Sequence, residues 1–243
     1  MIPPKEATKH FKRQCEYKRL EVICSLLKEG DRVLDVGCGI GTYTSDPLSC
    51  LPIKVTAIDS DLRTIQYMQE SNCSKNVEFF CVDGEHFDSD WRYDVIVCSH
   101  TLEHVSAPIV LLGNLKRLLK DDGILYLAIP NGFGAFEAQN LLPRLLSKSN
   151  CGRELIHKMA GKGKDTLNTE SPHICFFTAS RVRRLLLKAG FKIERQSSDE
   201  FLGGIVFDKI FSKVAILAKW NTNVAGRLPM RMTNGWIFVC RKS

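Results

Sequence analysis

One extended segment of the chain ends in residues suited to binding a charged small molecule. Residues 32–36 are rich in β-forming side chains and include Asp35, and Gly37, Gly39 and Gly41 follow directly. Glycines let the backbone approach a ligand closely and present N–H groups at the start of a following helix. The G-x-G-x-G spacing differs from the G-x-G-x-x-G of dinucleotide-binding turns. A carboxylate two positions before the first glycine repels a pyrophosphate and attracts an ammonium group.

Two further β-rich segments also end in acidic residues. Asp59 and Ser60 close the second segment, and Asp83, Gly84 and Glu85 follow the third. The carboxyl ends of parallel strands meet at one edge of a sheet, where open α/β proteins bind ligands. An acid after the second strand suits ribose hydroxyls, and one after the third can reach an adenine amino group. Each acid alone is better explained as a surface or capping residue, so the series of three is what indicates a site.

The elements that must position these residues alternate along the chain. Helix-like stretches at 16–28, 61–70, 107–120 and 178–189 lie between short β-rich segments at 32–36, 53–58, 77–82, 93–98, 123–129, 191–196 and 235–240. This alternation predicts a parallel sheet covered by helices on both faces. The 243 residues suffice for one domain over 1–243, since such a chain buries roughly 70% of its surface. Residues 130–172 and 197–233 interrupt the alternation and are predicted insertions that form a lid over the substrate site.

These motifs together resemble the class I S-adenosylmethionine-dependent methyltransferases, in the branch that includes quinone-biosynthesis and other small-molecule enzymes. The resemblance covers residues 18–130 and, more loosely, 172–195. It implies a Rossmann-like α/β fold with a seven-stranded, mostly parallel sheet whose last strand is antiparallel. It also implies S-adenosyl-L-methionine as cofactor and S-adenosyl-L-homocysteine as product. The residues that it implies for cofactor binding are Asp35, Gly37, Cys38, Gly39, Gly41, Asp59, Ser60, Asp83, Gly84, Glu85, Ser99, His100 and His104.

Two histidines are candidates for the general base of such a reaction. His173 precedes a Phe-Thr pair, and in the resembling branch a similar histidine borders the active site; His104 is the second candidate. A histidine with an ordinary pKa near 6.5 accepts a proton at neutral pH. The alternative is a histidine that only packs at a helix entrance. No metal site is expected, because Cys98, which could join His100 and His104, lies in a predicted buried strand and nothing completes the coordination.

The charge of the chain is unevenly distributed. Of the net +7, residues 31–140 carry −8 and residues 141–243 carry +12. The negative part suits a cofactor that bears a sulfonium and an ammonium, and the basic part suits an anionic acceptor or surface. Residues 207–219 place apolar side chains at helical spacing with lysines between them. They predict a helix that roofs the pocket or, as the alternative, makes peripheral contact with a membrane.

The expected location is cytoplasmic. Ten scattered cysteines without a C-x-x-C pair indicate reduced thiols, and neither a signal segment nor a membrane-spanning run is visible. The expected function is methyl transfer to an oxygen, or less readily a nitrogen or carbon, of a small acceptor that is anionic or lipid-linked.

Two other functions remain open from the sequence. One is a non-enzymatic binding or assembly partner that keeps the fold, and the other is an RNA methyltransferase. The second is disfavoured because base-amino methyltransferases of this fold carry an Asn/Asp-Pro-Pro-aromatic element after the fourth strand. Here that place reads Ser99-His100-Thr101-Leu102, and no RNA-binding module is appended.

Overall fold

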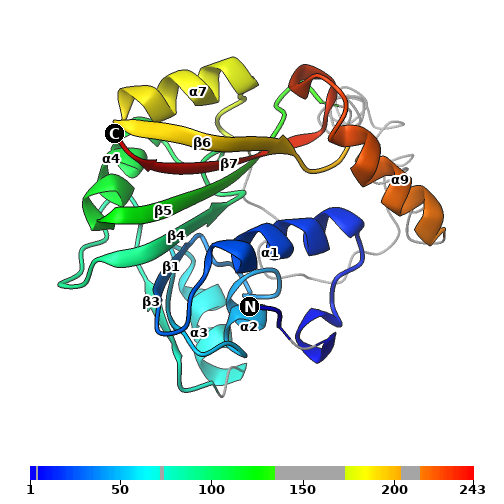
Figure 1. Cartoon of the computed structure of the whole chain (residues 1–243). Coiled ribbons are helices and arrows are strands. Elements are labelled where there is room, and N and C mark those ends of the chain that lie inside the picture. The colour runs from blue at the N-terminus through cyan, green and yellow to red at the C-terminus, as the bar shows by residue number, and fades with distance from the viewer. Residues whose placement is uncertain (4, 72–73, 135–172, 204–213) are drawn as a thin grey trace, which may run out of the picture.

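The computed structural model describes residues 1–3, 5–71, 74–134, 173–203 and 214–243, and strands alternate with helices along them (Figure 1). The strands are β1 (Arg32–Val36), β2 (Lys54–Asp59), β3 (Val77–Cys81), β4 (Tyr93–Ser99), β5 (Leu119–Pro130), β6 (Phe191–Ser198) and β7 (Gly235–Lys242). The helices are α1 (Gln14–Leu26), α2 (Ser45–Leu48), α3 (Leu62–Ser71), α4 (Pro108–Leu118), α7 (Ala179–Lys188) and α9 (Ala215–Ala225). Two short 3-10 helices, η1 (Lys5–Thr8) and η2 (Met230–Met232), complete the described elements.

The described strands form one seven-stranded sheet in the order β3-β2-β1-β4-β5-β7-β6. The pairs from β3 to β5 are parallel, whereas β7 is antiparallel to both β5 and β6. The predicted sheet, mostly parallel with an antiparallel last strand, is therefore confirmed. After β3 the chain returns to the other side of β1 and forms β4. The resulting change of direction between β1 and β4 opens a crevice at their carboxyl ends, where such sheets bind ligands.

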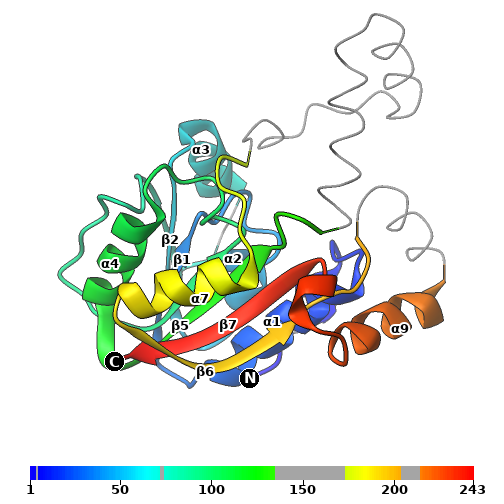
Figure 2. The same cartoon turned by 90° about the horizontal axis from the view of Figure 1, so that it is seen from above.

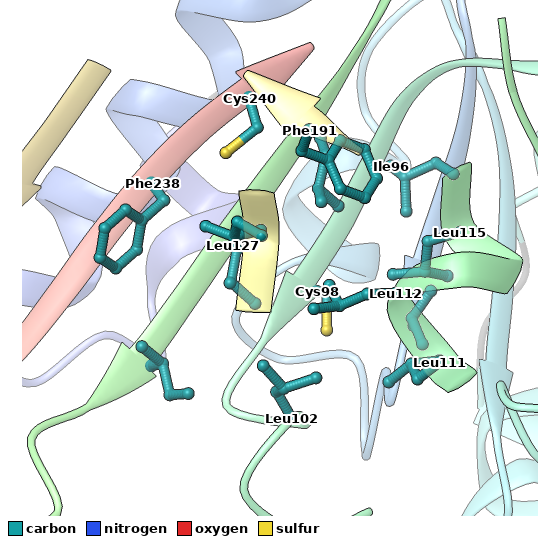
Figure 3. Packing of buried hydrophobic residues seen from close by; sticks show 14 of the residues in the cluster. Ile96, Cys98, Leu102, Leu111, Leu112, Leu115, Leu127, Phe191, Phe238 and Cys240 are labelled. Carbon is teal, nitrogen blue, oxygen red and sulfur yellow. The ribbon is translucent and has the colours of Figure 1, made fainter. Parts of the chain in front are cut away.

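Two hydrophobic layers hold the helices against the sheet. Successive side chains of a strand point to opposite faces, so Val33 joins one layer and Leu34 the other. The layer that contains Leu34 is covered by α4 and α7, and Figure 3 shows Leu111 and Leu115 of α4 against the side chains of the central strands. The layer that contains Val33 is covered by α1, α2 and α3. In Figure 1, α7 and α1 accordingly lie on opposite sides of β5 and β7.

The boundary between α4 and β5 differs from the prediction. The predicted helix through Lys120 is wrong, because α4 ends at Leu118 and the strand begins at Leu119. Leu119 pairs with Tyr93 of β4, and the Nζ of Lys120 donates to Asp94 at 2.6 Å. These contacts across the sheet outweigh the helical preference of the leucine-rich run.

The predicted insertions lie largely outside the described residues. Residues 135–172 and 204–213 are among those not described, so most of the predicted insertion 130–172 and residues 207–213 of the predicted helix 207–219 have no structural description. The predicted insertion 197–233 is described outside residues 204–213 and contains the end of β6, α9 and η2. The described helix in that region, α9, covers 215–225 and packs beside α1 (Figure 2). Within the described ranges, no helix has both the length and the apolar character needed to cross a membrane. The eight cysteines that are described are all free thiols.

Candidate active site

A cavity of about 950 Å³ lies at the carboxyl ends of β1, β2 and β4, where the strand order reverses. Three groups of residues line it: the turn after β1, the ends of β2 and β3, and the end of β4 together with one side of α1. The predicted cofactor residues among them are Asp35, Gly37, Cys38, Gly39, Gly41, Asp59, Ser60, Asp83, Gly84, Ser99, His100 and His104. The structure thus brings twelve of the thirteen predicted residues to one cavity.

The glycine turn after β1 is fixed by hydrogen bonds to β2. The N–H groups of Gly37 and Cys38 both donate to the carbonyl oxygen of Ile58, at 2.8 and 3.0 Å. Gly37, Gly39 and Gly41 have φ values of 69°, 52° and 71°, in the left-handed region that favours glycine. A Cβ on Gly37 would lie 2.3 Å from Oγ1 of Thr101. The turn therefore brings backbone, not side chains, to the wall of the cavity.

The Gly37→Ala variant should be destabilised by about 2 kcal/mol or more, because a left-handed alanine costs roughly 1–2 kcal/mol and the new methyl group meets Thr101. Urea unfolding of the full chain measures this loss. The matched control is Gly113→Ala, since Gly113 lies exposed on α4 with open space around it. That control should be as stable as the parent or gain about 0.5–1 kcal/mol. Equal unfolding midpoints for the two variants would contradict this account of the turn.

Asp35 is a buried carboxylate at the cavity wall. It is 2% exposed, and Oγ of Ser45 donates to its Oδ2 at 2.6 Å. Burial raises the pKa of Asp35 to about 7, the negative charge of Asp59 adds to the shift, and the bond from Ser45 opposes it. In the described part of the chain no basic side chain pairs with Asp35 or lowers its pKa. A buried acid of this kind fits a cationic ligand such as the ammonium group of S-adenosylmethionine.

The acids after β2 and β3 differ in their surroundings. Oδ2 of Asp59 accepts the N–H of Gly39 at 2.9 Å, and Oδ1 accepts the N–H of Asp61 at 3.0 Å. Asp59 therefore joins the glycine turn to the end of β2. Asp83 is exposed at the rim and accepts the N–H of Glu85. Glu85 itself is not among the lining residues, because its Oε1 accepts the N–H of Ala107 at 3.0 Å, where α4 begins.

The end of β4 contributes the histidine side of the cavity. His100 has a φ of 55°, which is uncommon for a residue other than glycine, and its Nδ1 lies 3.4 Å from Oε1 of Glu103. Desolvation and the charge of Arg19 lower the pKa of His100, against the opposing effect of Glu103. Burial raises the pKa of the nearby Cys98 thiol well above its usual range. Cys98 is thus a packed thiol, as predicted for a buried strand.

His173 contacts His104 and is not among the residues that line the cavity. The two rings are 4.9 Å apart at an interplanar angle of 67°, and only His104 lines the cavity. The N–H groups of Ile174 and Cys175 both donate to the carbonyl oxygen of Glu103, at 2.9 and 3.0 Å. This anchors the segment that carries His173. Glu103, His104 and His173 form a group whose nitrogen and oxygen ligand atoms all lie within 4.8 Å of one another, a different set from the Cys98, His100 and His104 considered from the sequence.

Sequence reasoning missed the contribution of α1. Arg13, Glu16 and Arg19 line the cavity. Arg19 donates through Nε to Oδ2 of Asp199 at 2.9 Å, and this carboxylate is 1% exposed. Although burial would lower the pKa of Arg19, Asp199 keeps it above its usual value. No motif or spacing in the sequence relates two residues that are 180 positions apart, so only the fold reveals the pair.

The sheet topology, the glycine turn and the acids at neighbouring strand ends are those of the class I S-adenosylmethionine-dependent methyltransferase fold. The chain belongs to the methyltransferase-domain family, whose model matches residues 9–196. This covers more than half of the chain and includes every residue of the cavity.

Individual relatives match shorter stretches. The chain is 34% identical over 110 residues to a ubiquinone biosynthesis O-methyltransferase of Glaesserella parasuis serovar 5, covering 42% of this chain and 46% of the relative. It is 34% identical over 94 residues to a malonyl-(acyl-carrier protein) O-methyltransferase of Acetivibrio thermocellus, covering 38% and 33%. The matches thus span less than half of the length of either relative.

A solved structure supports the fold over nearly the whole chain. The (4+2)-cyclase SpnF superimposes with a TM-score of 0.60 at 20% identity, covering 93% of this chain and 80% of that one. Because that protein is described as a cyclase, the likeness shows the fold and not the reaction.

Proposed function

We propose that the protein transfers the methyl group of S-adenosylmethionine to an oxygen of a small acceptor. The observation that carries the proposal is the single cavity that joins the glycine turn and the strand-end acids to the histidine side of β4. At about 950 Å³ it lies near the upper end of the range for small-molecule sites, so it has room for cofactor and acceptor together. The relatives named as O-methyltransferases support oxygen as the methylated atom.

The cofactor residues are proposed to act as their positions suggest. Asp35 and the glycine turn hold the methionine part, Asp59 accepts hydrogen bonds from the ribose hydroxyls, and Asp83 with Gly84 lies at the adenine end. Glu85 supports this end indirectly through the start of α4. The bound sulfonium supplies an already activated methyl group, so the protein has to position the acceptor and remove its proton.

The histidine side of the cavity is proposed to receive the acceptor hydroxyl. His104 lines the cavity, and the ring of His173 packs against the ring of His104. Arg13, which precedes α1, and Arg19 of α1 line the same cavity and are compensated by acids, Arg19 by Asp199 and Arg13 by Glu16. A hydroxylated acceptor is therefore favoured over one held mainly by its negative charge.

Residues 1–243 are proposed to act as one domain, with the two insertions as a lid over this end.

Methyl transfer is tested with methyl-labelled S-adenosylmethionine and host-cell extract. The products are partitioned into organic, aqueous and macromolecular fractions, and the labelled product is treated with base and acid to distinguish ester, ether and amine. Label in the organic phase supports a lipid-linked acceptor, and label in the aqueous phase supports a soluble metabolite. Label in RNA would show that the methyl acceptor is a nucleic acid and not a small molecule. No label in any fraction, with S-adenosylhomocysteine bound, would favour the non-enzymatic function instead.

Cofactor binding should weaken as the pH falls through 7. The pKa of Asp35 is raised to about 7, and a cationic ligand prefers its ionised form. For one such group the ionised fraction falls about tenfold between pH 8 and pH 6. Calorimetric titration with S-adenosylhomocysteine should show this loss of affinity. Titrations at pH 6 in two buffers of different ionisation enthalpy should show that binding releases close to one proton, whereas proton uptake would contradict the assignment.

A further inference from the structure

We propose that Glu103, His104 and His173 bind one divalent transition-metal ion, with zinc as the reference ion, at the acceptor side of the cavity. Two imidazoles and one carboxylate are a ligand set found in catalytic zinc sites that keep a further position open. Imidazole ligands favour zinc, iron or nickel over magnesium and calcium, which prefer oxygen. The role of the ion toward the acceptor rests on the proposed function, whereas the binding of the ion does not.

The three side chains are close enough to share an ion. Their ligand atoms all lie within 4.8 Å of one another. Bonds of about 2.0–2.1 Å in a tetrahedral arrangement would place ligand atoms about 3.3 Å apart. Closing the site therefore takes a shift of the order of 1 Å, which rotation of the imidazole rings about their side-chain bonds supplies.

A second observation concerns the carboxylate of Glu103. The residue is 1% exposed, and neither of its carboxylate oxygens accepts a hydrogen bond from the described residues. Nδ1 of His100 lies 3.4 Å from Oε1, without the geometry of a hydrogen bond. A buried carboxylate without hydrogen bonds is costly, and most buried polar groups in proteins are satisfied. A metal ion between this carboxylate and the two histidines accounts for its position.

The backbone holds this group of ligands together. Glu103 and His104 follow β4, and the N–H of His104 donates to the carbonyl oxygen of Thr101 at 2.9 Å. The segment of His173 is tied to the carbonyl oxygen of Glu103 by two backbone hydrogen bonds. The ligands therefore come from two segments about seventy residues apart that are docked directly at the site. Since His104 also lines the cavity, an ion bound to it borders the space proposed for the acceptor.

This position suits the proton chemistry of an oxygen methyltransfer. A divalent ion lowers the pKa of a hydroxyl group that coordinates it. The acceptor O–H bond then breaks with its proton passing to water. The oxygen forms the new bond to the methyl carbon, and the electron pair of the broken C–S bond stays on sulfur. Under this proposal the two histidines act on the hydroxyl through the ion and not as free bases.

Metal binding to the full chain is measured after treatment with a chelator, by titration with Co²⁺ and Zn²⁺. The expected result is one ion per chain, visible Co²⁺ absorption bands of nitrogen and oxygen ligation, and displacement of Co²⁺ by Zn²⁺. His104→Ala, His173→Ala and Glu103→Gln should each weaken binding by about 100-fold or more. The control His10→Ala changes an exposed histidine outside the group and should bind as the parent does.

Folding and function are followed separately in the same preparations. A thermal shift with S-adenosylhomocysteine shows whether each variant is folded, because this ligand is proposed to bind through β1 and β2. Failure of the parent to bind Co²⁺ or Zn²⁺ at micromolar concentration would overturn the proposal. Unchanged Co²⁺ bands in folded His104→Ala and His173→Ala would overturn it as well. Binding as expected, without methyl transfer to any acceptor, would uphold the site while refuting the proposed function.

Discussion

The Asp35→Asn variant should be more stable than the parent when no cofactor is present and should bind S-adenosylhomocysteine about 100-fold or more weakly. The pKa of Asp35 is raised to about 7 in the folded chain, above its value of 3.8 in a model compound. A shift of this size corresponds to a few kcal/mol by which burial opposes the charged form. The parent therefore becomes less stable as the pH rises from about 4 toward 7, because Asp35 must then carry its charge while buried. Asparagine keeps the shape of the side chain and carries no charge, so the variant should gain roughly 2 kcal/mol at pH 8.

Urea unfolding at pH 5 and pH 8 separates this effect from a general change in packing. At pH 8 the free energy of unfolding of the parent should be lower than that of Asp35→Asn. At pH 5 the difference between the two proteins should be smaller. Asp90→Asn changes an exposed acid, and it serves as the control for removing one negative charge. If Asp35→Asn were less stable than the parent at pH 8, or bound S-adenosylhomocysteine within a few-fold of it, Asp35 would not be the ammonium partner.

The Asp199→Ala variant should lose about 3–5 kcal/mol of stability. Asp199 and Arg19 form a buried ion pair, with exposed side-chain fractions of 1% and 13%. Removing the carboxylate leaves the guanidinium of Arg19 desolvated and without its partner, which is the costly way to break such a pair. Because Arg19 also lines the cavity, binding of the acceptor should weaken in any variant that still folds. Chemical unfolding measures the loss of stability, and the yield of labelled product from host-cell extract, at an unchanged affinity for S-adenosylhomocysteine, measures the effect on the acceptor.

A matched control exists at Asp88. Its Oδ1 accepts a hydrogen bond from Arg117 at 2.7 Å, but its side chain is 74% exposed. Asp88→Ala should therefore cost far less stability than Asp199→Ala. Each variant removes an aspartate carboxylate that is paired with an arginine, and the two sites differ mainly in burial. Similar losses for Asp88→Ala and Asp199→Ala would mean that burial of the Arg19 pair is not what makes it important.

Much of the fold was predictable because its signals are local. Residues 32–36 were predicted as a strand with the observed bounds of β1, since an apolar run there stops at a glycine turn. The predicted helix 178–189 starts at the residue that caps α7, since Oγ1 of Thr178 accepts the N–H of Arg181 at 3.3 Å. The start of β5 was missed because Leu118 and Leu119 continue the apolar pattern of α4. Only pairing with Tyr93 on a neighbouring strand assigns Leu119 to the sheet.

The site was predictable to the extent that it is built from strand ends. Asp35, Asp59 and Asp83 could be placed at one edge because parallel strands share their direction. The remainder depends on contacts between distant segments. The buried partner of Arg19 lies 180 positions away in the sequence. His173 reaches its neighbours because the backbone of the residues that follow it is hydrogen-bonded to Glu103. No periodicity in a single sequence records such pairings.

The place of β7 in the sheet also affects the order in which the chain folds. This strand follows β6 in the sequence but lies between β5 and β6, and among the described strands β6 pairs only with β7. During synthesis the strands β1 to β5 can assemble as soon as they leave the ribosome, whereas β6 has no strand to join until β7 has emerged. Such long-range pairing is slow, and the edge of β5 stays open to wrong partners in the meantime. The nascent protein therefore passes through a stage with most of the cofactor cavity formed and one sheet edge unprotected, at which a chaperone would have most to protect.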